Sequence, residues 1–307
     1  MTTLDLPGAK SDLDNYRTER SFLGADHQRN ERRTWIVAAI CAVTLAAQVT
    51  GGLVFHSMAL TASGLHMGAH VAALLTAAGA YALARRYAVS RRFAFGTGKF
   101  GDLAGFANAM VLGVTAILIA VESVQRLRTP ERVDYGSALP LAVAGLAVTL
   151  VCVWLLRPRG PAQDLNISAA HLHLSADAFA GGLAIAGLAA GQRFGWAWAD
   201  PLAGLAAAAL VAQFALSLIR RTAANLLDMN PSAELTAEVR TRLEAQGERV
   251  SDLHLWRLGP GHHAAVAVVV ADHPLPAAAY HARLSGLEGL SHVTVEVRGA
   301  DNVLCQS

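Results

Sequence analysis

The chain has 307 residues, of which 53% are hydrophobic and only 16% are charged, and its formal net charge is +2 at pH 7. Because a soluble domain usually carries about 25% charged residues, this composition excludes a wholly soluble protein and indicates a membrane protein with a soluble portion. The sequence carries no nucleic-acid-binding signature, so no nucleic acid partner is expected.

The apolar stretches of the chain predict its membrane helices. Residues 1–33 are polar and charged and are predicted to form a cytoplasmic tail. The first apolar run is too long for the hydrophobic region of a signal peptide. Six such stretches follow, each near or above the roughly 20 residues that span a bilayer as a helix, and they predict a six-helix transmembrane domain over residues 34–222. They cover residues 34–55, 57–84, 103–125, 137–156, 166–190 and 199–219, to within a few residues.

Lysine and arginine residues near the helix ends predict the orientation, because cytoplasmic loops carry an excess of them. The side that holds both termini is rich in these residues, whereas the other side has Arg126, Arg128, Arg132 and Arg193. We therefore expect both termini in the cytoplasm and an integral protein of a bacterial-type inner (plasma) membrane. The residues on the cytoplasmic side are Arg29, Arg32, Arg33, Arg85, Arg86, Arg91, Arg92, Lys99, Arg157, Arg159, Arg220 and Arg221.

The sequence changes character after Asp228, where charged and β-branched residues replace the long apolar runs. Gly259-Pro260-Gly261 lies between two segments rich in β-branched residues, which is typical of a hairpin. The order αββαβ predicts a small cytoplasmic α+β domain over residues 229–300, with a tail at 301–307. The predicted elements are helices at 232–246 and 276–287 and strands at 250–258, 263–271 and 292–298.

Cysteines are few in this chain and do not suggest a disulfide framework. Cys41, Cys152 and Cys305 lie far apart and form no CxxC motif. Two of them lie in apolar runs, so we predict that these two are small buried thiols.

Two histidine motifs lie inside apolar stretches, His66-Met-Gly-Ala-His70 in the second and His173-Leu-Ser-Ala-Asp177 in the fifth. On a helix, residues i and i+4 lie one turn apart on the same face, so each motif presents two metal-type ligands in one direction. Counted from opposite membrane surfaces, both motifs fall near the middle of the bilayer, where ionisable groups are costly and argue for function. We therefore predict one metal site formed by His66, His70, His173 and Asp177. Four imidazole and carboxylate ligands suit tetrahedral zinc, or cobalt in its place.

Other polar residues have more ordinary interpretations. His171 is expected about 160° around the helix from His173, at about 100° per residue, and therefore away from the metal. Asp200, which precedes Pro201, is predicted to be a helix N-cap. A regulatory metal site with undetermined ligands and ordinary composition are both open interpretations of the C-terminal residues His254, His262, His263, His273, His292, Glu296 and Cys305.

Further motifs surround the two histidine pairs in a fixed order. They are Ser57-Met-Ala-Leu60, Phe95-Gly-Thr-Gly-Lys99, Leu226-Leu-Asp228 and Asp252-Leu-His-Leu-Trp256. With these motifs the chain resembles the cation diffusion facilitator family from about residue 30 to residue 300. Members of that family are proton-coupled exporters of divalent transition metals, with six membrane helices and a cytoplasmic ferredoxin-like domain, and they usually work as homodimers. The resemblance therefore implies a transporter and not an enzyme, with metal ions and protons as substrates and no permanent cofactor.

At a few positions the sequence differs from the usual family pattern, and these positions indicate which metal is transported. Similar zinc exporters usually carry His-x-x-x-Asp in the second helix, whereas the second ligand here is His70. This pattern resembles the branch that exports cobalt and nickel, which implies Co²⁺ or Ni²⁺ as the transported ion and Zn²⁺ as well; a zinc- or iron-preferring exporter is the alternative. Some members bind metal in the loop between helices two and three, but Phe93 and Thr97 stand at those places here. The family positions that match Lys99 and Asp228 are similarly a lysine and an aspartate, which implies an ion pair at the cytoplasmic face.

Two functions of other classes compete with transport. A membrane metal-dependent oxidase or desaturase also uses HxxxH, but such enzymes need HxxHH clusters at the cytoplasmic surface, and the sequence has none. HExxH is missing too, which argues against a zincin-type protease. A metal sensor would fit the soluble domain, but six membrane spans with a polar core favour transport.

Overall fold

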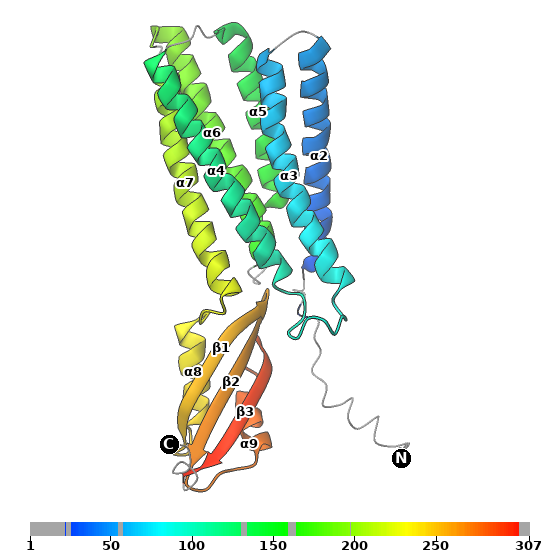
Figure 1. The fold of residues 1–307 in the computed structure, drawn as a ribbon, viewed down its shortest axis with the longest axis vertical. Coiled ribbons are helices and arrows are strands. Elements are labelled where there is room, and N and C mark those ends of the chain that lie inside the picture. Colours follow the sequence, from blue (N-terminus) through cyan, green and yellow to red (C-terminus); the bar gives the residue numbers. More distant parts are fainter. Residues whose placement is uncertain are drawn as a thin grey trace.

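The structure is a computed structural model that describes residues 22, 26–54, 58–129, 134–158, 164–196 and 198–300, without the side chains of residues 52, 58–66 and 69. In this part of the chain, six long helices form a bundle, and a small α+β domain lies at one end of it (Figure 1). The long helices are α2 (His27–Val54), α3 (Met58–Arg86), α4 (Phe100–Arg128), α5 (Tyr135–Leu156), α6 (Leu165–Phe194) and α7 (Ala199–Leu226).

The first described helix begins earlier than its apolar stretch predicts. The polar composition of residues 27–33 predicts that they belong to the tail, but α2 already begins at His27. The reason is that polar side chains of these first turns pack against α3: Glu31 is buried, and its Oε1 lies 3.0 Å from Arg85 Nη2. An apolar pattern detects the lipid-facing part of a helix and misses turns that extend beyond it. Most of the remaining tail and residues 301–307 lie outside the described residues.

The bundle has the side-chain distribution of a protein that crosses a bilayer. Among the described helices, α2, α4, α5, α6 and α7 are long and apolar enough to span a membrane, and α3, with 29 residues, packs against α2 and α4. Large apolar side chains such as Ile117 and Leu118 face outward. The rings of Phe194, Trp196 and Trp198 stack at the end remote from the C-terminal domain, as aromatic residues do at a membrane–water interface. The chain is an integral membrane protein.

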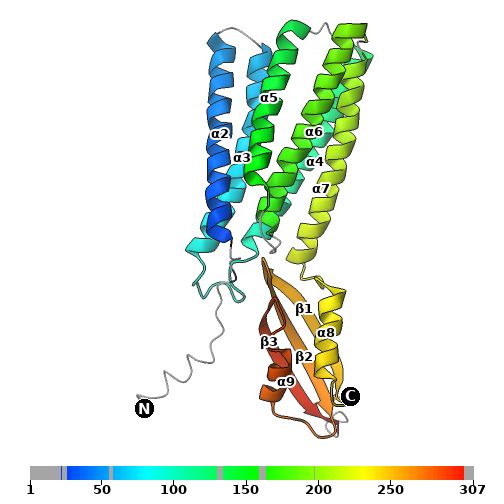
Figure 2. The ribbon, with the colours of Figure 1, turned by 180° about the vertical axis from the view of Figure 1, so that it is seen from behind.

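Helices that are far apart in the sequence lie side by side in the bundle. α4 runs along α7 and α2 along α3, while α6 packs against both α5 and α7 (Figures 1 and 2). The largest buried apolar cluster lies between α2, α3, α5 and α6 and includes Val37, Leu74, Leu156 and Ile167. The facing surfaces of α3 and α6, which carry the two histidine motifs, therefore lie inside the bundle.

The C-terminal domain follows the predicted αββαβ order. Its elements are α8 (Ala233–Leu243), β1 (Arg249–Gly259), β2 (His262–Ala271), α9 (Ala277–Leu284) and β3 (Leu290–Gly299). β1 pairs antiparallel with β2, which confirms the predicted hairpin, and β3 pairs parallel with β2. α8 and α9 cover one face of this sheet (Figure 2), where Val239, Val269, Tyr280 and Leu284 form a buried core.

Two glycines set the contact between this domain and the loop from α3 to α4. A Cβ atom on Gly98 would overlap the carbonyl oxygen of Leu258, and one on Gly259 would lie 2.5 Å from the carbonyl oxygen of Phe22. Neither backbone can retreat without breaking the contact, so glycine is required at both positions. The end of β1 is thereby held directly against the helix bundle.

Candidate metal site

Three of the four predicted ligands meet where α3 and α6 face each other. His70 Nδ1 lies 3.2 Å from Asp177 Oδ2, and His173 Nε2 lies 3.3 Å from the same oxygen. The two imidazole nitrogens are 3.3 Å apart, and their rings meet edge to face. In a tetrahedral site with ligand atoms about 2.0–2.1 Å from the metal, those atoms are about 3.3 Å from one another. The three atoms therefore already have the spacing of one face of a metal tetrahedron.

The burial of these residues agrees with a functional role. The side chains of His70, His173 and Asp177 are 4%, 5% and 7% exposed. A buried carboxylate is costly unless it is paired or binds a metal, and the cost is greater still at membrane depth. Among the residues that the structure describes, these three form the one group of three or more His, Cys, Asp or Glu residues whose ligand atoms all lie within 4.8 Å of one another.

His66, the fourth predicted ligand, belongs to α3 and precedes His70 by four residues. Its backbone is therefore one helical turn from His70. Its side chain lies outside the described part of the structure, so its place in the ligand set stays a prediction.

A cavity of about 400 Å³ leads away from the three ligands. His70 and Asp177 lie in its wall, which is otherwise mostly apolar and is built from α3, α4, α5, α6 and α7. Ala138 in the first turn of α5 and Gly204 near the start of α7 also line it. Both helices begin at the end of the bundle remote from the C-terminal domain (Figure 1). The cavity therefore runs from the ligands toward that far end.

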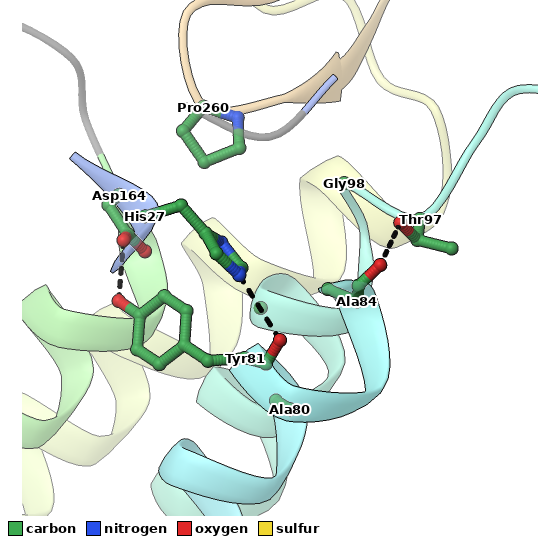
Figure 3. A pocket seen from close by; sticks show the side chains of 9 residues that line it. His27, Ala80, Tyr81, Ala84, Thr97, Gly98, Asp164 and Pro260 are labelled. Atoms are coloured by element: carbon green, nitrogen blue, oxygen red, sulfur yellow. Dashed lines mark hydrogen bonds between the residues drawn. The ribbon is translucent and has the colours of Figure 1, made fainter. Parts of the chain in front are cut away.

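On the opposite side of the ligands, polar side chains tie three helices together. Asp164, which caps α6, accepts hydrogen bonds at Oδ2 from Tyr81 Oη (2.5 Å) on α3 and from Asn30 Nδ2 (3.0 Å) on α2. Asn166 Nδ2 donates to the carbonyl oxygen of Ala77 over 2.8 Å. Figure 3 shows Tyr81 and Asp164 beside a cavity of only about 20 Å³, which is room for one water molecule. The bundle is thus tightly packed next to the C-terminal domain and hollow on the far side.

Comparison with known proteins identifies the family. Residues 34–227, which include every helix of the bundle except the first turns of α2, match the model of the cation efflux transmembrane domain. The chain belongs to the cation efflux family, the cation diffusion facilitators. Its members are transporters and not enzymes, so the rival reading as a membrane oxidase or desaturase is wrong.

Curated relatives of this cation efflux protein are metal transporters of bacteria. The zinc transporter ZitB of Escherichia coli (strain K12) is 33% identical over 233 residues, 75% of this chain and 74% of the relative. The metal cation efflux system protein CzcD of Cupriavidus metallidurans is 31% identical over 257 residues, 81% of each chain. The cadmium, cobalt and zinc/H(+)-K(+) antiporter of Bacillus subtilis is 27% identical over 300 residues, 92% of this chain and 96% of the relative. The chain is accordingly a metal cation efflux transporter.

Ion pairs lie where the C-terminal domain of the transporter meets its helices. Lys99 Nζ, just before α4, contacts Asp228 Oδ1, just after α7, which is the pair that the family resemblance implied. A second pair, which the sequence does not predict, joins Arg257 of β1 to Asp102 in the first turn of α4, with Nη1 and Oδ1 3.4 Å apart. This second pair is the more buried, with side chains 9% and 3% exposed against 31% and 53% for Lys99 and Asp228. The two residues are 155 positions apart in the sequence, so no local sequence pattern around Arg257 predicts that Asp102 is its partner.

The exposed pair should contribute little on its own. Surface pairs are worth about 0–1 kcal/mol, so Lys99→Ala should lower transport and thermal stability only slightly. Asp228 has a positive φ of 56°, which asparagine also tolerates. Asp228→Asn is therefore a better partner variant than alanine, because it removes the charge and keeps the backbone preference.

A double-mutant cycle on Lys99→Ala and Asp228→Asn measures the coupling between the two charges. We expect the double variant to lose less than the sum of the single losses. Purely additive losses in transport and melting temperature would mean that the two charges act independently.

Thr97 and Asp200 both make contacts within the helix bundle. Thr97, at a place where some family members bind metal, donates through Oγ1 to the carbonyl oxygen of Ala84 over 2.8 Å. Asp200 is not the N-cap of α7, because the helix begins one residue before it and Trp198 holds the cap position. It instead lies in the first turn, with Oδ2 3.6 Å from Arg126 Nη1.

Histidines of the C-terminal domain do not gather around a common point. His262 Nδ1 lies 2.7 Å from Ser291 Oγ, and His263 Nδ1 lies 3.2 Å from the carbonyl oxygen of Gly289. Burial lowers the pKa of both imidazoles from the usual value. His292 instead packs against the ring of Phe95. In the described residues these histidines belong to no group of three or more converging ligand atoms, and Cys305 lies outside the described residues.

Proposed function

We propose that this transporter exports Co²⁺, Ni²⁺ and Zn²⁺ from the cytoplasm in exchange for external protons. The observation that carries the proposal is the tetrahedral spacing of His70, His173 and Asp177 at the floor of a cavity. His66, one turn from His70, would supply the fourth ligand. The name of the Bacillus subtilis relative describes an antiporter of cadmium, cobalt and zinc, which supports the same class of transport.

Proton coupling follows from the chemistry of the ligands. Imidazole and carboxylate groups must be deprotonated to bind a metal, so metal and protons compete for the same groups. Imidazole titrates near pH ~6.5 in model compounds, which suits a site that loads metal on one side and takes up protons on the other. No covalent step is needed.

The described conformation corresponds to one half of the transport cycle. The cavity gives the ligands a route toward the far end, while the hydrogen bonds of Asp164 hold α2, α3 and α6 together at the other end. If the C-terminal domain is cytoplasmic, as the arginine distribution predicts, this is the outward-facing state. Loading metal then requires the helices to separate around Asp164, so that access alternates about a fixed site. The family resemblance further suggests a homodimer in the inner membrane.

Metal-stimulated proton movement in proteoliposomes tests this function. A gradient of Co²⁺, Ni²⁺ or Zn²⁺ across the membrane should drive a proton flux in the opposite direction. Gradients of Mn²⁺ and Mg²⁺ should drive little proton flux, because hard cations prefer oxygen ligands. Metal uptake with no accompanying proton flux would contradict the exchange mechanism. Protein reconstituted with Asp177→Asn serves as the inactive control.

His70 is expected to tilt the choice among these metals. A site with three imidazoles and one carboxylate favours borderline cations such as Co²⁺ and Ni²⁺, whereas similar zinc exporters carry aspartate in the place of His70. The variant His70→Asp should therefore raise the initial rate for Zn²⁺ relative to Co²⁺ and Ni²⁺ in parallel assays. Unchanged relative rates would show that His70 does not select the metal.

A further inference from the structure

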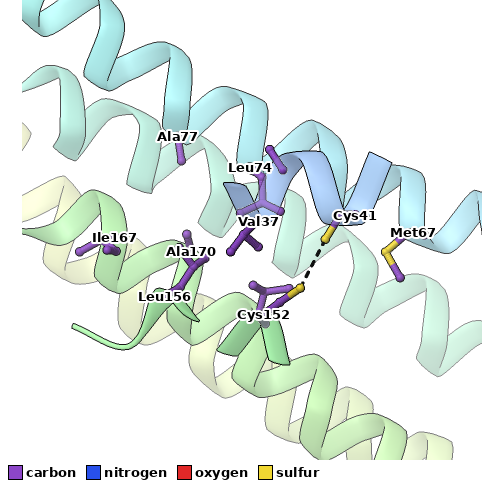
Figure 4. Packing of buried hydrophobic residues seen from close by; sticks show 11 residues of the cluster. Val37, Cys41, Met67, Leu74, Ala77, Cys152, Leu156, Ile167 and Ala170 are labelled. Atoms are coloured by element: carbon purple, nitrogen blue, oxygen red, sulfur yellow. Dashed lines mark hydrogen bonds between the residues drawn. The ribbon is translucent and has the colours of Figure 1, made fainter. Parts of the chain in front are cut away.

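Two thiols that the proposed transport cycle does not use lie close together inside the bundle. Cys41 of α2 and Cys152 of α5 are 1% and 0% exposed, and their Sγ atoms lie 3.9 Å apart. Figure 4 shows the two sulfur atoms directed toward each other across the helix interface. Two helices thus present a pair of potential ligand atoms to one point.

A third sulfur belongs to the same buried cluster. Met67 of α3 packs in the cluster that contains Cys41 and Cys152 (Figure 4). It also lines the 400 Å³ cavity, as does Thr149 of α5, which precedes Cys152 by three residues. On a helix this spacing places Thr149 and Cys152 on one face. The sulfur cluster therefore adjoins the wall of the cavity through Met67.

The spacing of the thiols matches a pair of metal ligands. Two thiolates about 2.3 Å from a zinc-sized ion, with their sulfur atoms 3.9 Å apart, subtend an angle of about 116° at that ion, and the longer bonds of a larger ion bring the angle closer to the tetrahedral value. This angle lies between the trigonal and tetrahedral values. Thiolate and thioether ligands together select soft cations over hard ones. We propose that Cys41 and Cys152, with the thioether of Met67, form a second metal site for a divalent thiophilic cation such as Cd²⁺.

The charge of the surroundings favours a divalent ion. The other members of the cluster are apolar, including Val37, Leu74 and Leu156, and an uncompensated charge there would be costly. Binding of Cd²⁺ breaks two S–H bonds, forms two Cd–S bonds and releases two protons, so the bound complex is neutral. A monovalent ion such as Ag⁺ would leave one net negative charge in the same apolar cluster.

A cadmium titration of the full-length protein, reduced with a phosphine and held in detergent micelles, tests this site. The readout is the ultraviolet charge-transfer band of a thiolate–cadmium bond, to which the imidazole and carboxylate ligands of the transport site do not contribute. We expect a saturable band with release of two protons per ion, and a weaker response to Ag⁺. We expect the same band in the His70→Ala variant, which would show that the cadmium bound to the thiols is not held by the transport site.

Variants at the three cysteines decide which thiols bind. Cys41→Ser and Cys152→Ser should each weaken the band and the affinity for cadmium, the double variant should abolish the band, and Cys305→Ser should leave it unchanged. Alanine at positions 41 and 152 should weaken the band to the same extent as serine, and circular dichroism with size-exclusion elution shows whether each variant is folded. Absence of the band in the reduced wild-type protein, or its persistence in the Cys41→Ser, Cys152→Ser double variant, would overturn the proposal.

The affinity for cadmium tests whether Met67 is a ligand. Met67→Leu keeps the apolar volume and removes the thioether, so the band should remain while cadmium binds more weakly. The loss should be at least the roughly 10-fold that even an outer-shell change costs a metal site. An unchanged affinity would overturn the assignment of three sulfur ligands.

Discussion

Replacing His70, His173 or Asp177 by alanine should abolish metal transport, with initial rates in proteoliposomes reduced by more than the roughly 10–100-fold that an outer-shell change costs. The reason is geometric, because each of the three supplies one corner of a face whose edges are 3.2–3.3 Å. Removal of any corner leaves too few ligands for a buried, desolvated cation. We expect His66→Ala to have the same effect, since it would remove the fourth corner.

His171→Ala is the matched control for these variants. His171 lies on the same helix as His173, two residues earlier, and outside the group of converging ligand atoms. Its replacement should leave transport close to that of the wild-type protein. If two of the four proposed ligands can be lost with transport intact, the site has been assigned to the wrong residues.

The pairing of the two histidine motifs could be predicted because each motif is a local pattern with a fixed period. A spacing of four residues on a helix places two side chains on one face whatever else the chain does. Lengths of apolar sequence likewise located the six helices, because a bilayer requires about 20 apolar residues per span. The depth of each motif followed from counting residues, and the structure brings His70, His173 and Asp177 together.

Interactions between distant polar residues could not be predicted in the same way. Asp164 has the local features of an N-cap, and it does accept a hydrogen bond from the backbone of Asn166. Its contacts with Tyr81 and Asn30 depend on how α2, α3 and α6 pack, which no periodicity encodes. The same holds for the first turns of α2, where Asn30 and Glu31 are buried by neighbouring helices. Polarity alone therefore misplaced the end of the tail.

The contact between Arg257 and Asp102 is the other feature that packing alone reveals, and its loss should have a large effect. Both side chains are almost fully buried where β1 meets α4, and Arg257 Nε also donates to the carbonyl oxygen of Gly259 over 3.1 Å. Removal of one partner of a buried pair leaves an uncompensated charge and costs about 3–5 kcal/mol. Arg257→Met should therefore destabilise the attachment of the C-terminal domain, as measured by faster hydrogen exchange of the β1 backbone amides.

Comparison with an exposed pair of the same domain isolates the effect of burial. Arg242 Nη2 and Glu238 Oε1 lie 2.7 Å apart on α8, with side chains 36% and 50% exposed. Such a helix pair is worth only about 0.3–0.5 kcal/mol, and the other hydrogen bond of Arg242, from Nη1 to the carbonyl oxygen of Arg283, is long at 3.4 Å. Arg242→Met should therefore change the exchange of β1 very little. The double variant Asp102→Leu, Arg257→Met removes both buried charges and should recover much of the lost protection, since apolar replacement of a buried pair is often neutral. Equal effects of Arg257→Met and Arg242→Met would mean that the buried pair does not hold the domain in place. Failure of the double variant to recover would instead assign the loss to the packing and backbone contacts of Arg257, and not to its charge.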